Sequence, residues 1–315
     1  MERARERKEF AERKKEKAAA KRDARATNKR ARATEAAGGA KAPPAKVAKT
    51  LDNMREADET TVQADDVEVL ADEEDDEFAT YFRNEKKPKI MITTRPMPSK
   101  KLFPFIAELM GLLGSRAFYY PRKRFNLKDI CKWASKHKFT HLMVLGENKG
   151  RKKGHCDGMI ISHLPEGPTF HFKVSSVELG TDMRSAGNMK NNTGTPELLL
   201  NNFTTRLGHR VGRFLGSLFP HEPFFKGRRV VTFHNQRDFI FIRHHRYIFN
   251  LPGDVVQRKR VVEEAETRLQ EIGPRFCLKL KWIQVGTFDS LHGEYEWIHK
   301  RKIVASGAQW KRFVL

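Results

Sequence analysis

Residues 205–219 read TRLGHRVGRFLGSLF, and this is the most informative stretch of the chain. At about 100° per residue, its positions sort into arcs around a helix. One arc is apolar and contains Leu207, Val211, Phe214, Leu215 and Leu218, while the opposite arc is basic and contains Arg206, His209, Arg210 and Arg213. We therefore expect an amphipathic helix whose basic face lies over nucleic-acid phosphates, with a solvated basic face as the alternative.

Three glycines recur at every fourth residue of this predicted helix, at Gly208, Gly212 and Gly216. Each costs a helix about 1 kcal/mol relative to alanine, so something should offset the loss. The physical reason for such glycines is a close backbone approach, either by another segment of the chain or by a phosphate backbone.

Basic and aromatic residues interleave after this helix, where strands are expected at 229–235, 238–244 and 246–250. Apolar and polar residues alternate poorly in Asp238–Arg243, so we expect that strand to be buried on both faces. Most aromatic side chains then belong to the core, base stacking being the alternative, and arginines at strand ends are better placed to contact RNA. The aromatic residues are Phe224, Phe225, Phe233, Phe239, Phe241, Tyr247 and Phe249.

Composition limits the partners of the chain. Its 315 residues include 61 Lys and Arg against 39 Asp and Glu, for a formal net charge of +22. Such a basic excess favours a polyanion, which could be RNA, DNA or an anionic membrane surface. Three cysteines without a Cys-x-x-Cys pair argue against a disulfide framework and fit a reducing compartment. The sequence predicts no transmembrane helix and no cleaved targeting peptide.

Charge also suggests how the chain is divided. Residues 1–50 carry 17 basic and 7 acidic residues and form a basic N-terminal extension. Alone it should be disordered or frayed helix, and it is either a solvated tail or an arm for nuclear import or rRNA. A basic C-terminal tail is expected at 301–315.

An acidic linker at 51–88 separates the basic extension from the folded body, and its densest run is Asp72–Glu77. Such a run should repel itself and stay extended. It is either a solvated linker, or a segment that shields the basic body or contacts a basic partner. Phe78, Tyr81 and Phe82 then end the polar stretch, and they are expected to dock as an aromatic anchor where the body begins.

Patterning of the body predicts the α/β (α+β) class. The domain at 89–300 would contain two similar α/β halves, about 89–178 and 196–300, sharing one sheet or packed side by side. The expected elements of the first half are strands at 89–94, 117–120, 142–145, 158–164 and 169–175 and helices at 100–113, with Ser99 as N-cap and Gly114 as terminator, and 127–137. The second half adds the elements described above and strands at 276–285 and 294–299.

The sequence contains none of the common catalytic motifs. Phosphate-binding glycine loops, a nucleophile elbow and a zinc-protease motif are all missing. His155-Cys156-Asp157 lacks further ligands for a metal, and His244 and His245 point to opposite faces of a strand. We therefore expect a protein that is not an enzyme and has no metal or cofactor; a nuclease would need clustered carboxylates in the body.

Several stretches closely resemble the Brix family of ribosome-biogenesis factors, over roughly Lys89–Leu315. The likeness lies in Ile92–Thr94 with Pro98–Lys101, in the central motif at 201–213 and 227–241, and in Glu271–Phe276. Within the family, Asp76–Phe78, Arg243–Phe249 and Tyr295–Arg301 are similar to one group of large-subunit factors.

This resemblance implies a two-halved fold related to anticodon-binding domains. It also implies a nucleolar, nuclear location and binding to precursor rRNA of the large (60S) subunit, in the 5.8S and 25S–28S region. The implied partners are a nucleolar factor of the maintenance-of-killer protein 16 type and other pre-60S assembly factors.

Our leading hypothesis is a non-catalytic assembly factor that binds precursor rRNA, and the rival is a protein–protein scaffold in the pre-60S particle with only incidental RNA contact. The candidate RNA-binding residues share a positive or titratable side chain near the predicted helix, strand ends and loops. They are Arg206, His209, Arg210, Arg213, Lys226, Arg228, Arg229, Arg237, Arg243, His245, Arg246, Lys100, Lys101, Arg122, Lys123 and Arg124.

Overall fold

The part of the chain that the computed structural model describes is built around one sheet of eleven strands. The described residues are 22, 50, 60–62, 66–147, 155–184, 187, 194–222, 228–250, 266–288, 293–299 and 313–315. The chain divides into two units, Met1–Met54 and Arg55–Leu315. Arg22, which is helical, and Thr50 are the described residues of the first unit, and every element below belongs to the second.

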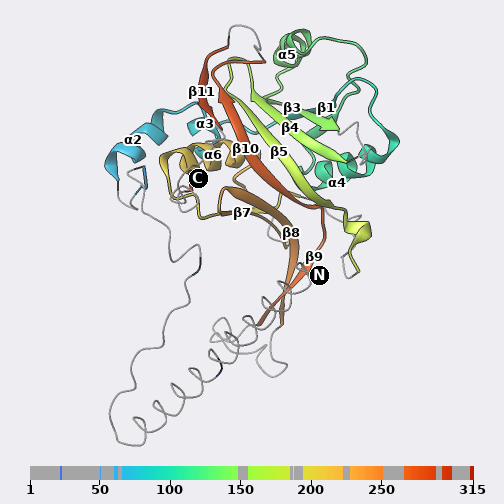
Figure 1. Cartoon of the computed structure of the whole chain (residues 1–315), viewed down its shortest axis with the longest axis vertical. Helices are drawn as coiled ribbons and strands as arrows, with labels where there is room; N and C mark the ends of the chain where they lie inside the picture. Colours follow the sequence, from blue (N-terminus) through green and yellow to red (C-terminus); the bar gives the residue numbers. More distant parts are fainter. Residues whose placement is uncertain are drawn as a thin grey trace, which may run out of the picture. The chain divides into compact units, whose positions relative to one another are not determined.

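The first half of the body supplies five neighbouring strands in the order β2-β1-β3-β4-β5. Figure 1 shows β3, β4 and β5 side by side. β1 is parallel to β2 and β3, because a helical crossover precedes each of the latter two strands. β4 and β5 continue the sheet antiparallel. The bounds are β1 Ile90–Thr94, β2 Ala117–Tyr119, β3 His141–Glu147, β4 Cys156–His163 and β5 Thr169–Glu178.

The second half extends the same sheet in the order β10-β8-β7-β6, with β9 paired to β8 and β11 to β10. The two halves meet where β10 pairs antiparallel with β5, for example at Leu278 opposite Val174. The bounds are β6 Glu197–Asn201, β7 Arg229–Gln236, β8 Phe239–Asn250, β9 Glu266–Glu271, β10 Arg275–Gln284 and β11 Tyr295–Ile298. The predicted pair of halves thus shares one sheet in the structure.

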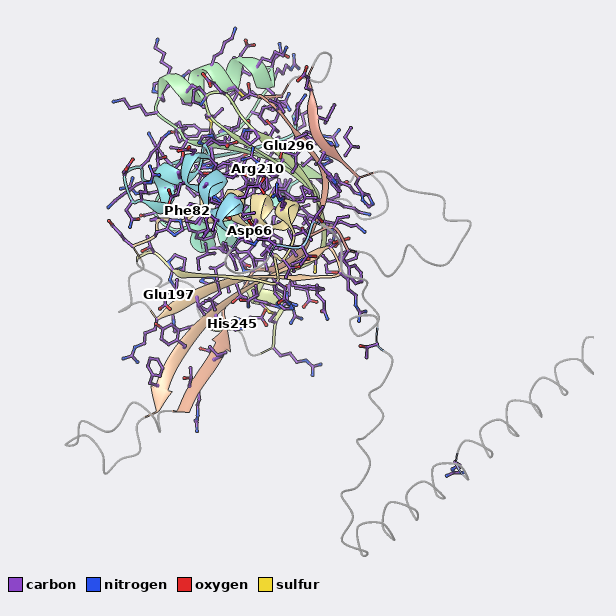
Figure 2. All side chains as sticks on the ribbon, turned by 90° about the vertical axis from the view of Figure 1, so that its left-hand side faces the viewer. Asp66, Phe82, Glu197, Arg210, His245 and Glu296 are labelled. Carbon is purple, nitrogen blue, oxygen red and sulfur yellow. The ribbon has the colours of Figure 1, made fainter. Side chains whose placement is uncertain are left out.

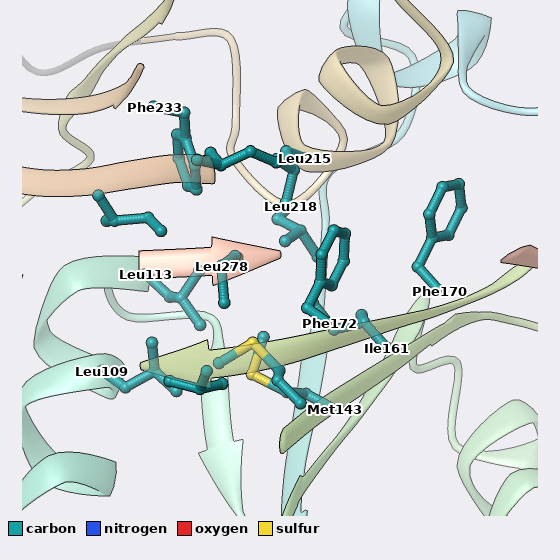
Figure 3. Packing of buried hydrophobic residues seen from close by; sticks show 14 of the residues in the cluster. Leu109, Leu113, Met143, Ile161, Phe170, Phe172, Leu215, Leu218, Phe233 and Leu278 are labelled. Carbon is teal, nitrogen blue, oxygen red and sulfur yellow. The ribbon is translucent and has the colours of Figure 1, made fainter. Parts of the chain in front are cut away.

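Helices cover the two faces of the sheet unequally. α3 (Ala79–Phe82), α4 (Phe103–Leu113) and α6 (Arg206–Gly216) contribute buried side chains to the main core on one face. Figure 3 shows part of that core, with Leu109 of α4, Phe172 of β5 and Leu215 of α6. α5 (Leu127–Lys136) packs against β1 and β3 in a smaller cluster on the other face. None of the described helices has the length and apolar character needed to span a membrane.

Most elements lie where the sequence placed them. The strand predicted at 89–94 is β1, and the helix predicted at 100–113 is a 3-10 turn, η1 (Lys100–Leu102), continued by α4. Gly114 ends that helix with φ +86°, as expected of its terminator. Ser99 was wrongly expected to cap it, because its side chain makes no cap hydrogen bond while its backbone N–H donates to Glu147 at 2.8 Å.

The second half departs further from the predictions. β6 and β9 were not predicted, and the two strands expected at 238–244 and 246–250 form one continuous strand, β8. Burial of this strand on both faces was wrong: Ile240 and Ile242 are fully buried, whereas Phe239 is 38% exposed on the other face. Phe249 is exposed as well, so the core assignment holds for Phe233 and not for these two aromatics. Phe224, Phe225 and the segment 301–312 lie outside the described residues.

The acidic linker contains a helix, α2 (Val67–Asp75), where an extended run was expected. Asp66 caps it, since its carboxylate accepts hydrogen bonds from the N–H groups of Glu68 and Val69. Self-repulsion among the acidic side chains was the reason for expecting extended backbone, and it is offset here by basic partners on α6. The predicted aromatic anchor is confirmed by Phe78 and Tyr81, whose side chains are 0% and 1% exposed.

Candidate nucleic-acid interface

α6 combines a side-chain cap with an apolar face. Thr205 Oγ1 accepts a hydrogen bond from the N–H of Gly208 at 2.9 Å, which satisfies one of the first-turn donors. Val211 and Phe214 are fully buried in the main core, and the ring of Phe214 stacks on Phe170 of β5 with centroids 3.8 Å apart. The predicted apolar arc is confirmed.

Two of the three glycines of α6 lie where other parts of the chain approach the helix closely. A Cβ atom at Gly216 would lie 2.8 Å from the ring tip of Phe82, and one at Gly208 would lie 3.2 Å from the backbone carbonyl carbon of Phe203. A Cβ at Gly212 would meet the ring of Phe203 at 3.5 Å, an ordinary contact. Of the two explanations for the glycine spacing, the structure therefore shows approach by the chain itself.

The basic face of α6 is covered by acidic residues from Asp66–Glu77, a segment here named the acidic cover. The shorter of two forked contacts joins Arg213 and Asp76, whose two carboxylate oxygens accept hydrogen bonds of 2.6 and 2.7 Å from Nε and Nη2. Nη2 also donates to the backbone carbonyl of Glu73 at 2.5 Å. Charge-assisted pairs with this forked geometry are among the strongest hydrogen bonds in proteins.

Arg210 makes a second forked pair, with Glu77, at 2.7 and 2.8 Å. Glu296 on β11 also accepts a hydrogen bond of 3.2 Å from Nε of Arg210. Figure 2 shows Arg210 and Glu296 close together. Burial alone would lower the pKa of Arg210, but the hydrogen bond with Glu77 and the nearby carboxylate charges raise it overall. Burial alone would raise the pKa of Glu77. The hydrogen bond from Arg210 outweighs this effect, so the pKa of Glu77 lies below its usual value.

The remaining two residues of the basic arc are also paired with the acidic cover. Arg206 donates to Glu68 at 2.8 Å, and His209 Nδ1 lies 2.8 Å from a carboxylate oxygen of Glu73. The chain just before the acidic cover is held to the same region, because the backbone N–H of Arg206 donates to Thr60 at 2.9 Å. All four predicted phosphate ligands of α6 thus contact carboxylates of the same chain.

Aromatic residues fix the acidic cover to the body. The hydroxyl of Tyr81 lies 3.0 Å from His163 Nε2, and the other nitrogen of that ring lies 2.9 Å from the carbonyl of Gly167. This pattern fits a neutral imidazole that donates to Gly167 and accepts from Tyr81. Burial lowers the pKa of His163 and raises the pKa of Tyr81 to about 12, so both groups stay uncharged near neutral pH.

Predicted residues of the strand region occupy different environments. Arg229 is 2% exposed and donates to the carbonyl groups of Gly111 and Gly194, so its guanidinium serves the core rather than the surface. Arg243 lies 3.7 Å from Glu271. The others are partly or fully accessible, and they are Arg228, Arg237, His245 and Arg246, whereas Lys226 lies outside the described residues.

The predicted cations of the first half remain at the surface. Lys100, Lys101, Lys123 and Arg124 are exposed, and Arg122 is half-buried with its Nε donating to the carbonyl of Phe125 at 3.0 Å. Three further exposed lysines lie at four-residue spacing on α5 and were not among the predicted residues. They are Lys128, Lys132 and Lys136. Their spacing places them on one helix face, a signal that could have been found in the sequence.

Metal-binding clusters and activated thiols are missing from the described part of the chain. No cluster of three or more His, Cys, Asp or Glu residues there could hold a metal ion. The three cysteines are free and buried, and burial raises the pKa of the Cys131 and Cys156 thiols to about 12, so neither is a ready nucleophile.

Comparison with known proteins agrees with the motifs quoted from the sequence. The family model for the Brix domain matches residues 95–282, which is more than half of the chain. The chain belongs to the Brix family. The matched residues run from the end of β1 to β10, so they include both halves of the sheet and α6.

Brix-family relatives share much of the chain. "Ribosome production factor 1" of Xenopus laevis is 46% identical over 263 residues, covering 84% of this chain and 71% of the relative. The protein of the same name from Rattus norvegicus is 48% identical over 263 residues, with 83% and 71% covered. The crystal structure of a probable ribosomal biogenesis protein from Aeropyrum pernix K1 is similar at 14% identity and a TM-score of 0.43, with 61% and 96% covered.

Proposed function

We propose that this Brix-family protein is a non-catalytic ribosome biogenesis factor that binds precursor rRNA of the large subunit in the nucleolus. Likeness to proteins named ribosome production factor supports the biogenesis role. The RNA-binding part of the proposal rests on one structural observation: exposed cations gather on and beside α5, outside the acidic cover. They are Lys123, Arg124, Lys128, Lys132 and Lys136.

Cations at this surface suit a phosphate backbone because each contact releases counterions from the nucleic acid. They lie on α5 and in the loop before it, and the helix holds Lys128, Lys132 and Lys136 at fixed spacing. A surface of this kind favours recognition of shape and backbone over base sequence.

The basic face of α6 contributes to RNA binding in this proposal only when the acidic cover leaves it. The carboxylates of Asp76 and Glu77 occupy the guanidinium forks that phosphate oxygens would otherwise use. RNA must therefore compete with groups that are already in place, and the first encounter is expected at the α5 surface.

The test is binding of the full-length protein to fragments of large-subunit precursor rRNA at several salt concentrations. Changing Lys128, Lys132 and Lys136 together to Glu is expected to weaken binding and to reduce the salt slope by roughly 0.7–0.9 per lost phosphate contact. The matched variant changes Arg206, Arg210 and Arg213 to Glu. If the acidic cover blocks α6, that variant has the smaller effect on the salt slope; an unchanged slope in both variants would remove the RNA assignment.

A protein–protein scaffold is the second candidate, and it is favoured by apolar residues on the β8–β9 hairpin. Ile248, Phe249 and Leu269 are 48%, 49% and 63% exposed, which fits an interface with a pre-60S assembly factor such as one of the maintenance-of-killer protein 16 type. Changing Phe249 to Ser should release such a partner from purified particles while RNA binding persists. RNA crosslinks confined to the N-terminal extension would favour the scaffold.

A further inference from the structure

An unassigned hollow of about 360 Å³ opens beside α5, on the face of the sheet opposite the main core. Its wall begins at Met91 and Thr93 of β1, continues through the loop after β2, and ends on the first turns of α5. This volume lies within the range of small-ligand sites in proteins. The lining residues outside β1 are Tyr120, Pro121, Arg122, Phe125, Asp129, Ile130 and Trp133.

The sheet places this hollow where open α/β sheets commonly bind ligands. β2, β1 and β3 are parallel, and the crossover helices α4 and α5 pack on opposite faces of them. Crevices at the carboxyl ends of such strands are favoured binding sites because loops diverge there. Thr93 is the penultimate residue of β1, and Tyr120 directly follows β2.

Three aromatic side chains around the hollow keep much of their surface in solvent. Tyr120, Phe125 and Trp133 are 39%, 61% and 42% exposed. The rings of Tyr120 and Trp133 meet edge to face with centroids 5.5 Å apart, and Trp133 also stacks over Phe139. A place at the edge of the hydrophobic core would explain the position of Trp133. It would not explain Phe125, whose largely exposed side chain lies in the loop before α5.

Polar groups in the hollow can read the edge of a flat ligand. Thr93 is 1% exposed, and its Oγ1 has no hydrogen-bond partner among the residues that the structure describes. A buried hydroxyl without a partner is unfavourable, so a ligand that supplies one is preferred. Arg122 offers further donors and Asp129 offers acceptors from the same lining. These groups suit the mixed donors and acceptors of a nucleobase.

Charge around the hollow selects the chemical class of the ligand. Four exposed cations directly precede or follow lining residues in the sequence, whereas Asp129 is the one acidic residue of the lining. The cations are Lys123, Arg124, Lys128 and Lys132. An apolar peptide anchor would use the aromatic walls and leave this positive rim unused. A nucleotide in single-stranded RNA uses both, because its base stacks on aromatic rings while its phosphates meet the cations.

We propose that this hollow holds one unstacked base of single-stranded RNA, with the base against Phe125 and Trp133, its edge at Thr93, and the flanking phosphates on the basic rim. The inference rests on the proposed RNA-binding function and specifies where that function reads a base. It also makes the α5 surface selective for unpaired RNA, since a base in a duplex cannot enter the hollow.

The test compares two oligouridines of about ten nucleotides, one intact and one with every base removed, bound to the full-length protein. Phe125→Ala is the main variant, because the exposed ring can be removed with little effect on folding. It should weaken binding of the intact RNA by about tenfold, with the salt slope and the binding of abasic RNA unchanged. Lys136→Ala is the control, and it should affect both RNAs equally through the salt slope.

Thr93→Val provides an independent arm, since it removes the hydroxyl without changing the size of the side chain. It should weaken binding of the intact RNA and leave the abasic RNA unaffected. If the unaltered protein binds both RNAs equally and Phe125→Ala changes neither, the hollow is not a base site although the proposed function stands. If the unaltered protein binds no RNA, both proposals fall. Loss of a protein partner alone in Phe125→Ala would assign the hollow to a peptide and overturn the proposal.

Discussion

Ion pairs on the same helix face differ in the water that reaches them. The side chains of Arg213 and Asp76 are 15% and 11% exposed, whereas those of Arg206 and Glu68 are 51% and 70% exposed. Asp76→Asn should lower the free energy of unfolding by about 2–3 kcal/mol, because it leaves a shielded guanidinium with a weaker partner. Glu68→Gln should have a much smaller effect, because water screens the exposed pair of Arg206 and Glu68. Urea unfolding measures both, and equal losses would show that burial does not decide the strength of these pairs.

A buried histidine should make stability depend on pH. His244 is fully buried on β8, its Nδ1 lies 2.9 Å from the carbonyl of Gly273, and burial lowers its pKa to about 4. As pH falls below about 6.5, the unfolded chain takes up the proton first, so up to about 3 kcal/mol of stability is lost between pH 6.5 and 4 and no more below that.

His244→Asn should remove this contribution while an amide N–H still donates to Gly273. Unfolding free energies measured from pH 7 to pH 4 should therefore fall less steeply in the variant. His141 and His163 are also buried with lowered pKa values, but they remain in both proteins and cancel in the comparison. Parallel pH profiles for the variant and the unaltered protein would contradict the assignment.

Single residues show how far sequence reasoning reached. Helical spacing identified all four basic residues of α6, because periodicity is a local property. Their partners could not be identified in the same way, since Asp76 and Arg213 are 137 positions apart. Arg228 and Arg229 are adjacent arginines, and the local sequence does not distinguish the exposed one from the buried one. The carbonyl groups that bind Arg229 come from distant parts of the chain, at Gly111 and Gly194.

Two glycines of α6 should respond in opposite directions to alanine. Gly212→Ala gains helix propensity, and its Cβ meets Phe203 at an ordinary 3.5 Å, so we expect stabilisation of about 0.5–1 kcal/mol. Gly216→Ala would place a Cβ 2.8 Å from the ring of Phe82, which also stacks on Arg213. Displacing that ring should make the second variant destabilising by about 1 kcal/mol. Thermal unfolding distinguishes the two, and stabilisation by both would mean that Phe82 moves without loss.

Elements were predictable where one periodicity dominated. β1, α4, α5 and the strands of the first half follow from apolar spacing and from glycine and proline at their ends. α2 was missed because the acidic sequence alone favours extension, and its helix exists beside the arginines of α6. β6 is a short edge strand whose parallel partner β7 begins 28 residues after the end of β6, so its pairing is set by the assembled sheet and not by its own pattern.

One sheet and one main core imply that the halves of the body unfold together. Cys156 on β4 and Cys277 on β10 are 4% and 6% exposed, and they report on the first and second half respectively. In variants that retain one of these cysteines, thiol labelling in increasing urea should give the same free energy of opening for both. Cys131, which is on α5 and belongs to the smaller cluster, should label with an equal or lower free energy. A lower value at Cys277 than at Cys156 would show that the second half opens independently.

The sequence did not determine how the two halves of the body are arranged in the whole molecule. Two similar α/β halves could be proposed from the order of elements, but whether they share a sheet could not. Edge strands of either half offer similar unpaired backbone groups, and only the complete set of side chains in the main core selects β5 and β10 as partners.

The pairing of β5 with β10 has a consequence during synthesis of the protein. β5 ends at Glu178 and β10 ends at Gln284, so at 5–20 residues per second a translating ribosome needs roughly 5–20 s to deliver the strand that completes the edge. Throughout that interval the nascent first half carries an open strand rich in phenylalanine and valine, which is a template for aggregation. We therefore expect a chaperone that occupies this edge to raise the yield of folded protein, and slow codons between the two strands to increase the dependence on it.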